Sequence, residues 1–126
     1  NGRRIVKCIK LDLHTLTFCS PESIIRISND IPLMKNYHPS ENENPTNAQL
    51  YRMYIEYYLN NHPEVNPNMD LIISQKEATE YGLPIQVYFF IRNKNWKEYE
   101  RIQSDIFDHL MVMVEKFDLK IYQYSD

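Results

Sequence analysis

The stretch GLPIQVYFFIRNKNWKEYERIQSDIFDHL, residues 82–110, decides the fold of this 126-residue chain. Its first part alternates between apolar and mixed positions, which predicts a strand over residues 83–92 with one buried face. After a short polar turn, Asn95 can cap a long helix whose apolar residues recur at three- and four-residue spacings. The apolar side of this helix consists of Tyr99, Ile102, Ile106, Leu110, Met113 and Phe117. The stretch therefore predicts an aromatic strand followed by an amphipathic helix.

The segments before this stretch supply a second strand and two helices. Alternation over residues 5–13 predicts a first strand, with a face that is apolar apart from Lys7. Ser20 and Pro21 are typical of a helix start and precede a short helix at residues 23–27. Residues 28–44 are rich in Asn, Pro, Ser and Glu, which predicts a surface loop.

A tyrosine-rich helix follows, capped by Thr46 or Asn47 and stopped by His62 and Pro63. Residues 69–78 predict a strand that forms an antiparallel hairpin with residues 83–92. Residues 119–124 predict a closing strand. The order strand, helices, strand, strand, helix, strand predicts a ferredoxin-like βαββαβ fold of the α+β class, with helices on one face of an antiparallel sheet.

Composition indicates one ordinary globular domain over residues 1–126. Hydrophobic residues make up 43% and charged residues 25%, and ten tyrosines against two glycines favour packed structure. A net charge of -3 gives no broad cationic field, so we expect no nucleic-acid partner, although Arg3, Arg4, Lys7 and Lys10 can form a local basic patch. RRM modules of the same topology bind RNA through exposed strand aromatics, but their basic-glycine-aromatic motif is missing here.

The two cysteines, Cys8 and Cys19, are too few for a disulfide framework or a four-ligand zinc site, so a reducing compartment is the simpler expectation. We find no run of eighteen apolar residues and no signal-peptide pattern. The opening residues, Asn1 and Gly2, lead almost directly into a strand without a methionine. This pattern suggests a piece of a longer protein.

No catalytic residues are predicted, because the chain has no nucleophile elbow and no phosphate-binding glycine loop. Asp105, Asp108 and His109 have helical i, i+3, i+4 spacing, which could hold a metal. A solvated acidic face with one flanking histidine is the preferred interpretation, because no second histidine-rich segment supplies further ligands. We therefore expect no metal, no cofactor and no enzyme activity.

One pair of segments departs from the pattern of a simple monomer. Residues 110–114 are apolar all round the helix, and the preceding tyrosine helix is also rich in aromatic residues. This predicts a candidate subunit interface formed by Tyr54, Tyr57, Tyr58, Met111 and Val112. Burial under the loop at residues 28–44 is the alternative.

Several of these motifs together resemble one family. They are Gly82-Leu83-Pro84, Tyr88-Phe89, Trp96, Glu98-Tyr99-Glu100, Ile102-Gln103 and Asp105-Ile106-Phe107-Asp108-His109. The first strand, opening at Gly2-Arg3-Arg4-Ile5, and the end of the tyrosine helix at Asn60, His62 and Pro63 extend the likeness over nearly the whole chain. In these motifs the chain resembles the C-terminal cytoplasmic domain of the larger bacterial channels in the mechanosensitive channel of small conductance (MscS) family.

The resemblance implies a domain of a homo-oligomer, commonly a heptamer, in the bacterial inner membrane. Such channels open under membrane tension, which relieves hypoosmotic stress, and this domain forms part of a vestibule on the cytoplasmic side. The transmembrane helices and the β domain would precede Arg3, and residues 29–44 match no part of the family pattern. Two other hypotheses stand beside it: a separate ligand- or RNA-binding ferredoxin-like module, and a small metal-dependent enzyme.

Overall fold

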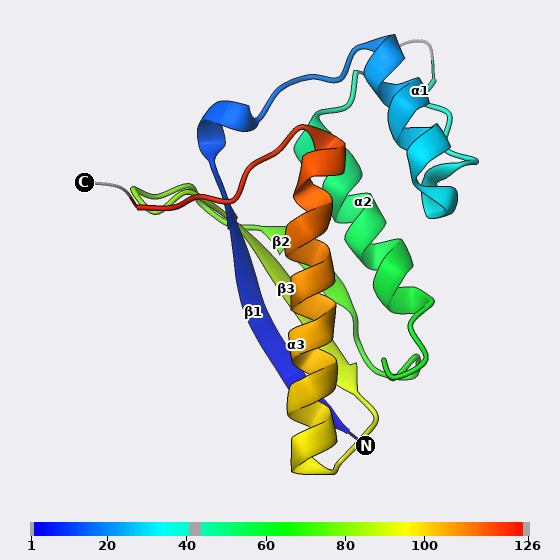
Figure 1. Cartoon of the computed structure of the whole chain (residues 1–126), viewed down its shortest axis with the longest axis vertical. Coiled ribbons are helices and arrows are strands. Elements are labelled where there is room, and N and C mark those ends of the chain that lie inside the picture. Colours follow the sequence, from blue (N-terminus) through cyan, green and yellow to red (C-terminus); the bar gives the residue numbers. More distant parts are fainter. Residues whose placement is uncertain (1, 41–43, 125–126) are drawn as a thin grey trace.

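The computed structural model describes residues 2–40 and 44–124 and shows an α+β arrangement (Figure 1). The elements in chain order are β1 (Arg3–Leu11), η1 (Leu13–Thr15), α1 (Pro21–Asp30), η2 (Pro32–Met34), α2 (Asn47–Asn60), β2 (Ile72–Gln75), β3 (Leu83–Ile91), α3 (Trp96–Met113) and η3 (Val114–Phe117). The elements labelled η are short 3-10 helices.

The strands form a three-stranded antiparallel sheet in the order β1-β3-β2. The central strand β3 pairs with β1 over its whole length, from Leu83 opposite Leu11 to Ile91 opposite Arg3. The predicted hairpin is confirmed, because β2 also runs antiparallel to β3. Its turn is closed by two backbone hydrogen bonds between Thr79 and Gly82, of 2.9 and 3.1 Å. Gly82 has a φ of 98°, in the region that favours glycine.

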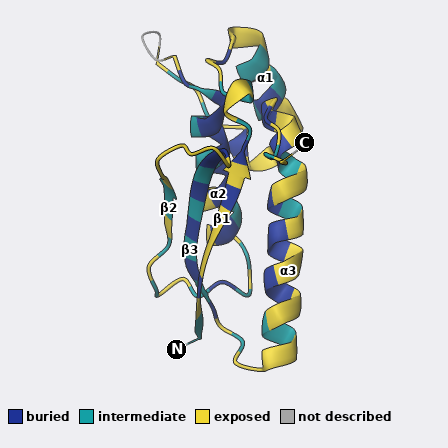
Figure 2. Cartoon of the chain, turned by 90° about the vertical axis from the view of Figure 1, so that its left-hand side faces the viewer, coloured by how far each residue is buried: buried dark blue, intermediate teal, exposed yellow. Residues whose placement is uncertain are grey.

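One face of the sheet is covered by helices and the other is open. Alternate residues of β3 are buried, from Leu83 to Ile91, as the period-two pattern predicts. Ile5, Ile9 and Leu11 of β1 point to the same buried side. The edge-on view shows α3 along this side of the sheet (Figure 2), and Figure 1 shows α2 next to α3. The expectation of helices over one sheet face is therefore confirmed for α2 and α3.

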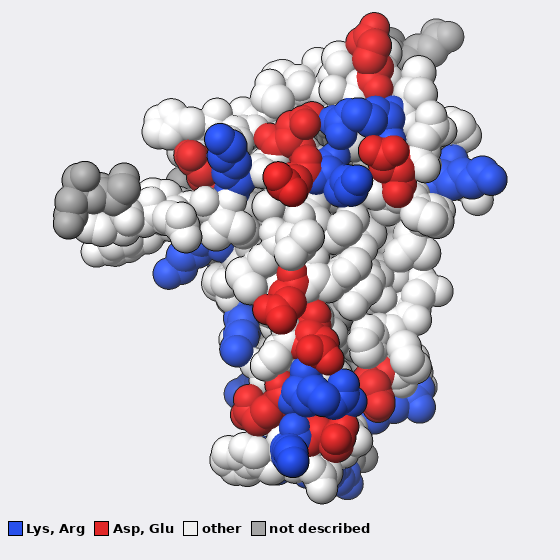
Figure 3. Space-filling view, viewed as in Figure 1, with Lys and Arg blue, Asp and Glu red and all other residues white. Residues whose placement is uncertain are grey.

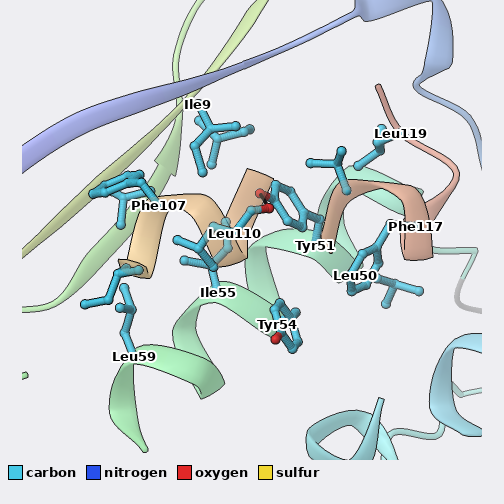
Figure 4. Packing of buried hydrophobic residues seen from close by; sticks show 14 of the residues in the cluster. Ile9, Leu50, Tyr51, Tyr54, Ile55, Leu59, Phe107, Leu110, Phe117 and Leu119 are labelled. Carbon is cyan, nitrogen blue, oxygen red and sulfur yellow. Dashed lines mark hydrogen bonds between the residues drawn. The ribbon is translucent and has the colours of Figure 1, made fainter. Parts of the chain in front are cut away.

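The core lies between the sheet and these two helices (Figure 4). The apolar stripe of α3 contributes Ile102, Ile106 and Leu110, all of which are buried. Across the helix pair, the Tyr51 hydroxyl donates a hydrogen bond of 2.6 Å to the Leu110 carbonyl, which satisfies its polar atom inside the core. The aromatic ring of Phe117 packs against Tyr51 and Tyr54. The predicted apolar stripe of α3 is thus the side of the helix that packs against the rest of the domain.

The three long helices begin where the sequence predicts. Ser20 caps α1 by accepting a hydrogen bond from the Ser23 backbone N–H. Thr46 caps α2 and Asn95 caps α3 through equivalent contacts with the residue three positions later. Each cap satisfies a backbone donor that the first helical turn leaves without an intrahelical partner.

The predicted closing strand is wrong, because residues 119–124 make only an isolated bridge, between Leu11 and Ile121. Two backbone hydrogen bonds flank it, from Asp12 N–H to the Lys120 carbonyl and from Tyr122 N–H to the Lys10 carbonyl. Continuing this antiparallel ladder would place Gln123 opposite Ile9 on the buried face, and a polar side chain is unfavourable there. The full ferredoxin-like βαββαβ order is therefore not formed.

Two other expected boundaries are also wrong. The first strand ends at Leu11 and not at residue 13, because Asp12 leaves the sheet and accepts a hydrogen bond from His14 N–H to start η1. The expected loop at residues 28–44 begins with the last turn of α1 and then forms η2, in which Met34 is buried. A predominantly polar segment thus still contributes a buried apolar side chain to the core.

Candidate subunit interface

The outer edge of the contact between α2 and α3 is an aromatic and histidine cluster. It comprises Tyr54 and Tyr58 on α2, His62 just after α2, and His109 on α3, and we call it the α2–α3 seam. The Tyr58 ring stacks on the His109 ring with centroids 4.3 Å apart and planes inclined by 13°. The Tyr54 ring is inclined to the His109 ring at 6.0 Å, and its hydroxyl is hydrogen-bonded to His109 Nε2. His62 meets Tyr58 edge-on at 5.7 Å.

Burial governs the ionisation of this seam. It lowers the pKa of His109, and His62 lowers it further, since two positive rings close together repel. Burial also lowers the pKa of His62, whereas the Glu64 carboxylate acts in the opposite direction. The pKa of Tyr54 is raised to about 12, mainly by burial. At neutral pH the seam is therefore composed of neutral rings.

The five residues predicted as an interface do not form one continuous surface. Tyr54 is only 4% exposed, so it belongs to the core and to the seam. Tyr57 is 41% exposed and Tyr58 is half-buried against His109. Met111 and Val112, at 41% and 69% exposure, lie near the end of α3. Adjacent helical residues point about 100° apart, so the last two face different neighbours.

The contacts of Phe107 and His109, about one turn before Met111 and Val112, show which neighbours these are. Phe107 packs on Phe89, and the Lys7 ammonium of β1 lies 5.6 Å from its ring. Met111 follows Phe107 by one turn and so lies toward β1. Val112 follows His109 by three residues and so lies beside the seam. By helical spacing, Val112 therefore lies on the His109 side of the outer face of α3, and Met111 on the side toward β1.

The face of α3 that carries these residues is unevenly charged. Figure 3 shows Lys, Arg, Asp and Glu gathered toward the two ends of this face, with an uncharged band across the upper half of α3. Near the start of the helix, Arg101 pairs with Glu98 at 2.8 Å and with Asp105 at 3.1 Å. Exposed apolar side chains such as Met111 and Val112, with ion pairs farther along the same helix, fit the composition of an interface centre and its rim.

The side chains of Asp105, Asp108 and His109, in the middle of α3, lie in different environments. Asp105 is held by Arg101, Asp108 is exposed, and His109 contacts the tyrosines of α2. Over residues 2–40 and 44–124, no group of three His, Cys, Asp or Glu side chains lies close enough to hold a metal ion. The spacing of these three residues therefore brings no ligand set together in the described part of the chain.

The predicted basic patch is split by the geometry of β1. Arg3 lies over the rings of Trp96 and Tyr99, at 5.2 and 5.0 Å from their centroids. Arg4 points to the opposite face of the strand, because successive strand residues alternate between faces. Instead of forming one cationic surface, Arg3 joins the start of β1 to the start of α3 through cation–π contacts.

A second apolar surface, on the open face of the sheet, was not predicted as a site. Val6 of β1 is paired with Tyr88 of β3, which is paired in turn with Ile72 of β2. Val6 and Ile72 are about half exposed, and Phe90 meets Tyr88 edge-on at 5.8 Å. The sequence signal for this surface was the mixture of apolar and polar residues on the second face of the two long predicted strands. That mixture does not reveal which face of the sheet the helices leave uncovered.

Beside α1, residues 37–40 and Asn44 help to line an open pocket of about 400 Å³. Its apolar lining includes Ile24, Ile25 and Tyr37, and His38 is among its polar residues. The buried Cys19 also borders it, and burial raises the pKa of this thiol. This pocket lies near the end of the fold and away from the seam.

Comparison with protein families adds a finding to this geometry. The family model described as "Mechanosensitive ion channel MscS, C-terminal" matches residues 43–121. This range covers well over half of the chain and includes α2, β2, β3 and α3. The chain belongs to the MscS family of mechanosensitive ion channels.

The family match places the seam and both exposed α3 residues inside the shared C-terminal domain of MscS channels. By contrast, β1 and α1 precede residue 43, although β1 forms the longest pairing in the sheet. In the described part of the chain, none of the helices has the length and apolar character needed to cross a membrane.

Proposed function

We propose that this chain is the cytoplasmic vestibule and assembly domain of an MscS channel that opens under membrane tension and relieves hypoosmotic stress. The observation that carries the proposal is the family match over residues 43–121. The domain forms one segment of the vestibule wall below the pore and contacts its copies in neighbouring subunits. Transmembrane segments elsewhere in the full protein attach it to the bacterial inner membrane, and the complete channel is a homo-oligomer, in our proposal a heptamer.

The exposed apolar residues support a role in assembly. Val112 and Tyr57 flank the seam, and the open sheet face adds Val6 and Ile72. Apolar side chains of this size gain about 1.5–3 kcal/mol each when they are fully buried. Interfaces between subunits bury such residues at their centre and leave charged residues at the rim. We therefore assign the subunit contact to Val112 on α3 and Tyr57 on α2.

The proposal is tested in the full-length channel, expressed in bacteria that lack their own mechanosensitive channels. We expect Val112→Glu to reduce the yield of assembled channel in native-size analysis and the survival of hypoosmotic shock. The isolated 126-residue chain with the same substitution should melt within a few degrees of the parent, because Val112 is 69% exposed. Glu100→Gln, an exposed change about three turns earlier on the same helix, is the matched control and should leave assembly unchanged.

Two results would contradict parts of this proposal. If the full-length parent gives no pressure-activated current in patch-clamp recordings, the channel function is wrong. If Val112→Glu leaves both assembly and current unchanged, the assigned interface is wrong while the channel function stands. Met111→Glu, on the other side of α3, shows which side of the helix the neighbouring subunit contacts.

A further inference from the structure

The ring of His109 is held by hydrogen bonding and stacking at the same time. Tyr58 covers one face of the ring at 4.3 Å, and the Tyr54 hydroxyl is bonded to Nε2. The two tyrosines come from consecutive turns of α2, and their own rings lie 6.0 Å apart. His109 therefore joins α3 to two successive turns of α2 near the outer edge of the core.

The hydrogen bond to Tyr54 indicates that His109 is an acceptor at Nε2. The Tyr54 side chain is almost fully buried, and over residues 2–40 and 44–124 its hydroxyl contacts no other acceptor. A buried hydroxyl proton without an acceptor is costly, so the Tyr54 O–H donates to Nε2 and the neutral ring carries its proton on Nδ1. Protonation of Nε2 would remove the lone pair that this hydrogen bond requires.

His62 is also an acceptor in the same seam. Its Nδ1 accepts a hydrogen bond of 3.1 Å from the Glu64 backbone N–H, directly after the end of α2. Its ring packs edge-on against Tyr58, which is stacked on His109. Protonation of Nδ1 would break the contact with Glu64 N–H. Both hydrogen bonds thus require a neutral histidine ring, and a positive charge on one ring makes protonation of the other less favourable.

We propose that the α2–α3 seam is an acid-sensitive latch, in which protonation of His109 and His62 breaks the contacts with Tyr54 and the Glu64 backbone and loosens the end of α2 from α3. Deprotonation restores both acceptors and closes the latch. No ligand or partner is required, because the four side chains and one backbone group already supply every contact.

Carboxylates near the seam favour protonated histidine rings, but they offset the effect of burial only in part. Asp105 lies one turn before His109 on α3 and would favour a positive ring, but Arg101 is bonded to its carboxylate at 3.1 Å. Glu64, after α2, favours a positive His62. Asp108 is exposed and, as the residue directly before His109, points about 100° away from it around α3. Tyr54 and Tyr58 are neutral at physiological pH, because burial raises the pKa of each hydroxyl.

The sign of the pH effect follows from the lowered pKa values of the two histidines. The unfolded chain takes up protons near the ordinary pKa of 6.5, whereas the folded seam takes them up at lower pH. Stability from the neutral rings is therefore complete above pH 6.5 and decreases as the pH falls below this value. The loss stops below the folded pKa values, where both states are protonated.

Loosening the seam also affects the neighbouring surface. Val112 lies beside His109 on α3, so movement of this part of the helix shifts the exposed residue assigned to the subunit contact. This consequence for assembly rests on the proposed function. The latch itself is a property of the chain and is tested without the channel.

The test follows both histidine rings by NMR in the 126-residue chain while the pH is lowered. We expect both rings to titrate below 6.5 and the melting temperature to fall by several degrees between about pH 7.5 and about pH 5.5. The double variant His62→Gln with His109→Gln should lose less than half as much over the same range. His38→Gln, an exposed histidine beside α1, is the matched control and should melt like the parent at each pH.

A midpoint at or above 6.5 for either ring would overturn the latch, as would a double variant that keeps more than half of the acid-induced loss. If the double variant does not fold, Tyr54→Phe replaces it. Removing the donor to Nε2 should raise the His109 midpoint toward 6.5, and an unchanged midpoint would then refute the proposed contact. Failure of the channel assays would leave these titrations unaffected.

Discussion

At the scale of single residues, the buried amide of Asn47 joins three parts of the chain. Its Oδ1 accepts hydrogen bonds of 3.0 Å from the backbone N–H groups of Thr17 and Ala48. Its Nδ2 donates to the carbonyl oxygens of Thr15 and Phe117 at 2.9 and 3.0 Å. Because the side chain is only 1% exposed, water cannot replace these partners. One amide thus fixes the start of α2 against η1 and η3.

We expect Asn47→Ala to reduce the free energy of unfolding by about 3 kcal/mol, because it leaves buried backbone groups without partners. Chemical denaturation of the chain measures this change. Asn60→Ala, at the exposed end of the same helix, is the control and should change stability by no more than about 0.5 kcal/mol. Equal effects of the two substitutions would show that the amide network contributes little.

At the scale of elements, α3 shows how one helix serves two surfaces. Its apolar stripe packs on the sheet and on α2, and Ile106 at the centre is fully buried. Its outer side carries the Glu98, Arg101 and Asp105 ion pairs, whose side chains are well exposed. Exposed ion pairs are each worth about 0–1 kcal/mol, so burial of the stripe dominates the stability of this element.

We expect Ile106→Asp to unfold the chain, because an unpaired carboxylate at this position costs more than about 4 kcal/mol. Circular dichroism during thermal melting measures the loss. Asp108→Asn, two residues away on the exposed side, should melt within a few degrees of the parent. Cooperative melting of Ile106→Asp near the parent temperature would contradict the assignment of the buried stripe.

At the scale of the whole molecule, exposed apolar side chains among the described residues include two groups on different sides of the fold. One is the open sheet face around Val6 and Tyr88, and the other is the outer part of α3 at Val112. They lie on opposite sides of the layered fold, since α3 covers the sheet on the side away from the open face (Figure 2). A subunit in a closed ring has neighbours on two sides, which suits this arrangement.

We expect the isolated chain to be monomeric or weakly associated in dilute solution. Subunits joined through a common membrane pore meet at high effective concentration, so each contact between domains can be individually weak. Sedimentation velocity over a range of protein concentrations tests this expectation. An oligomer that persists at nanomolar concentration would show that these surfaces assemble without the membrane-spanning segments.

Local sequence patterns predicted most of the helix starts and the central hairpin. Ser20, Thr46 and Asn95 could be recognised as caps because a cap depends on a few neighbouring residues. The closing strand was predicted wrongly because the alternation of residues 119–124 does not show what their partner would be. Strand pairing depends on the register with β1, which is distant in the sequence.

The sequence by itself therefore determined the class of the fold, the buried stripe of α3 and, through its motifs, the MscS family. The tertiary structure alone decided that Tyr54 is buried, that Val112 is more exposed than Met111, and that His109 meets His62 through Tyr58. The physical reason is the sequence separation over which each interaction acts. Caps, turns and periodicity act within a few residues, whereas the seam depends on how α2 and α3, which are separated by the whole hairpin, pack against the same sheet.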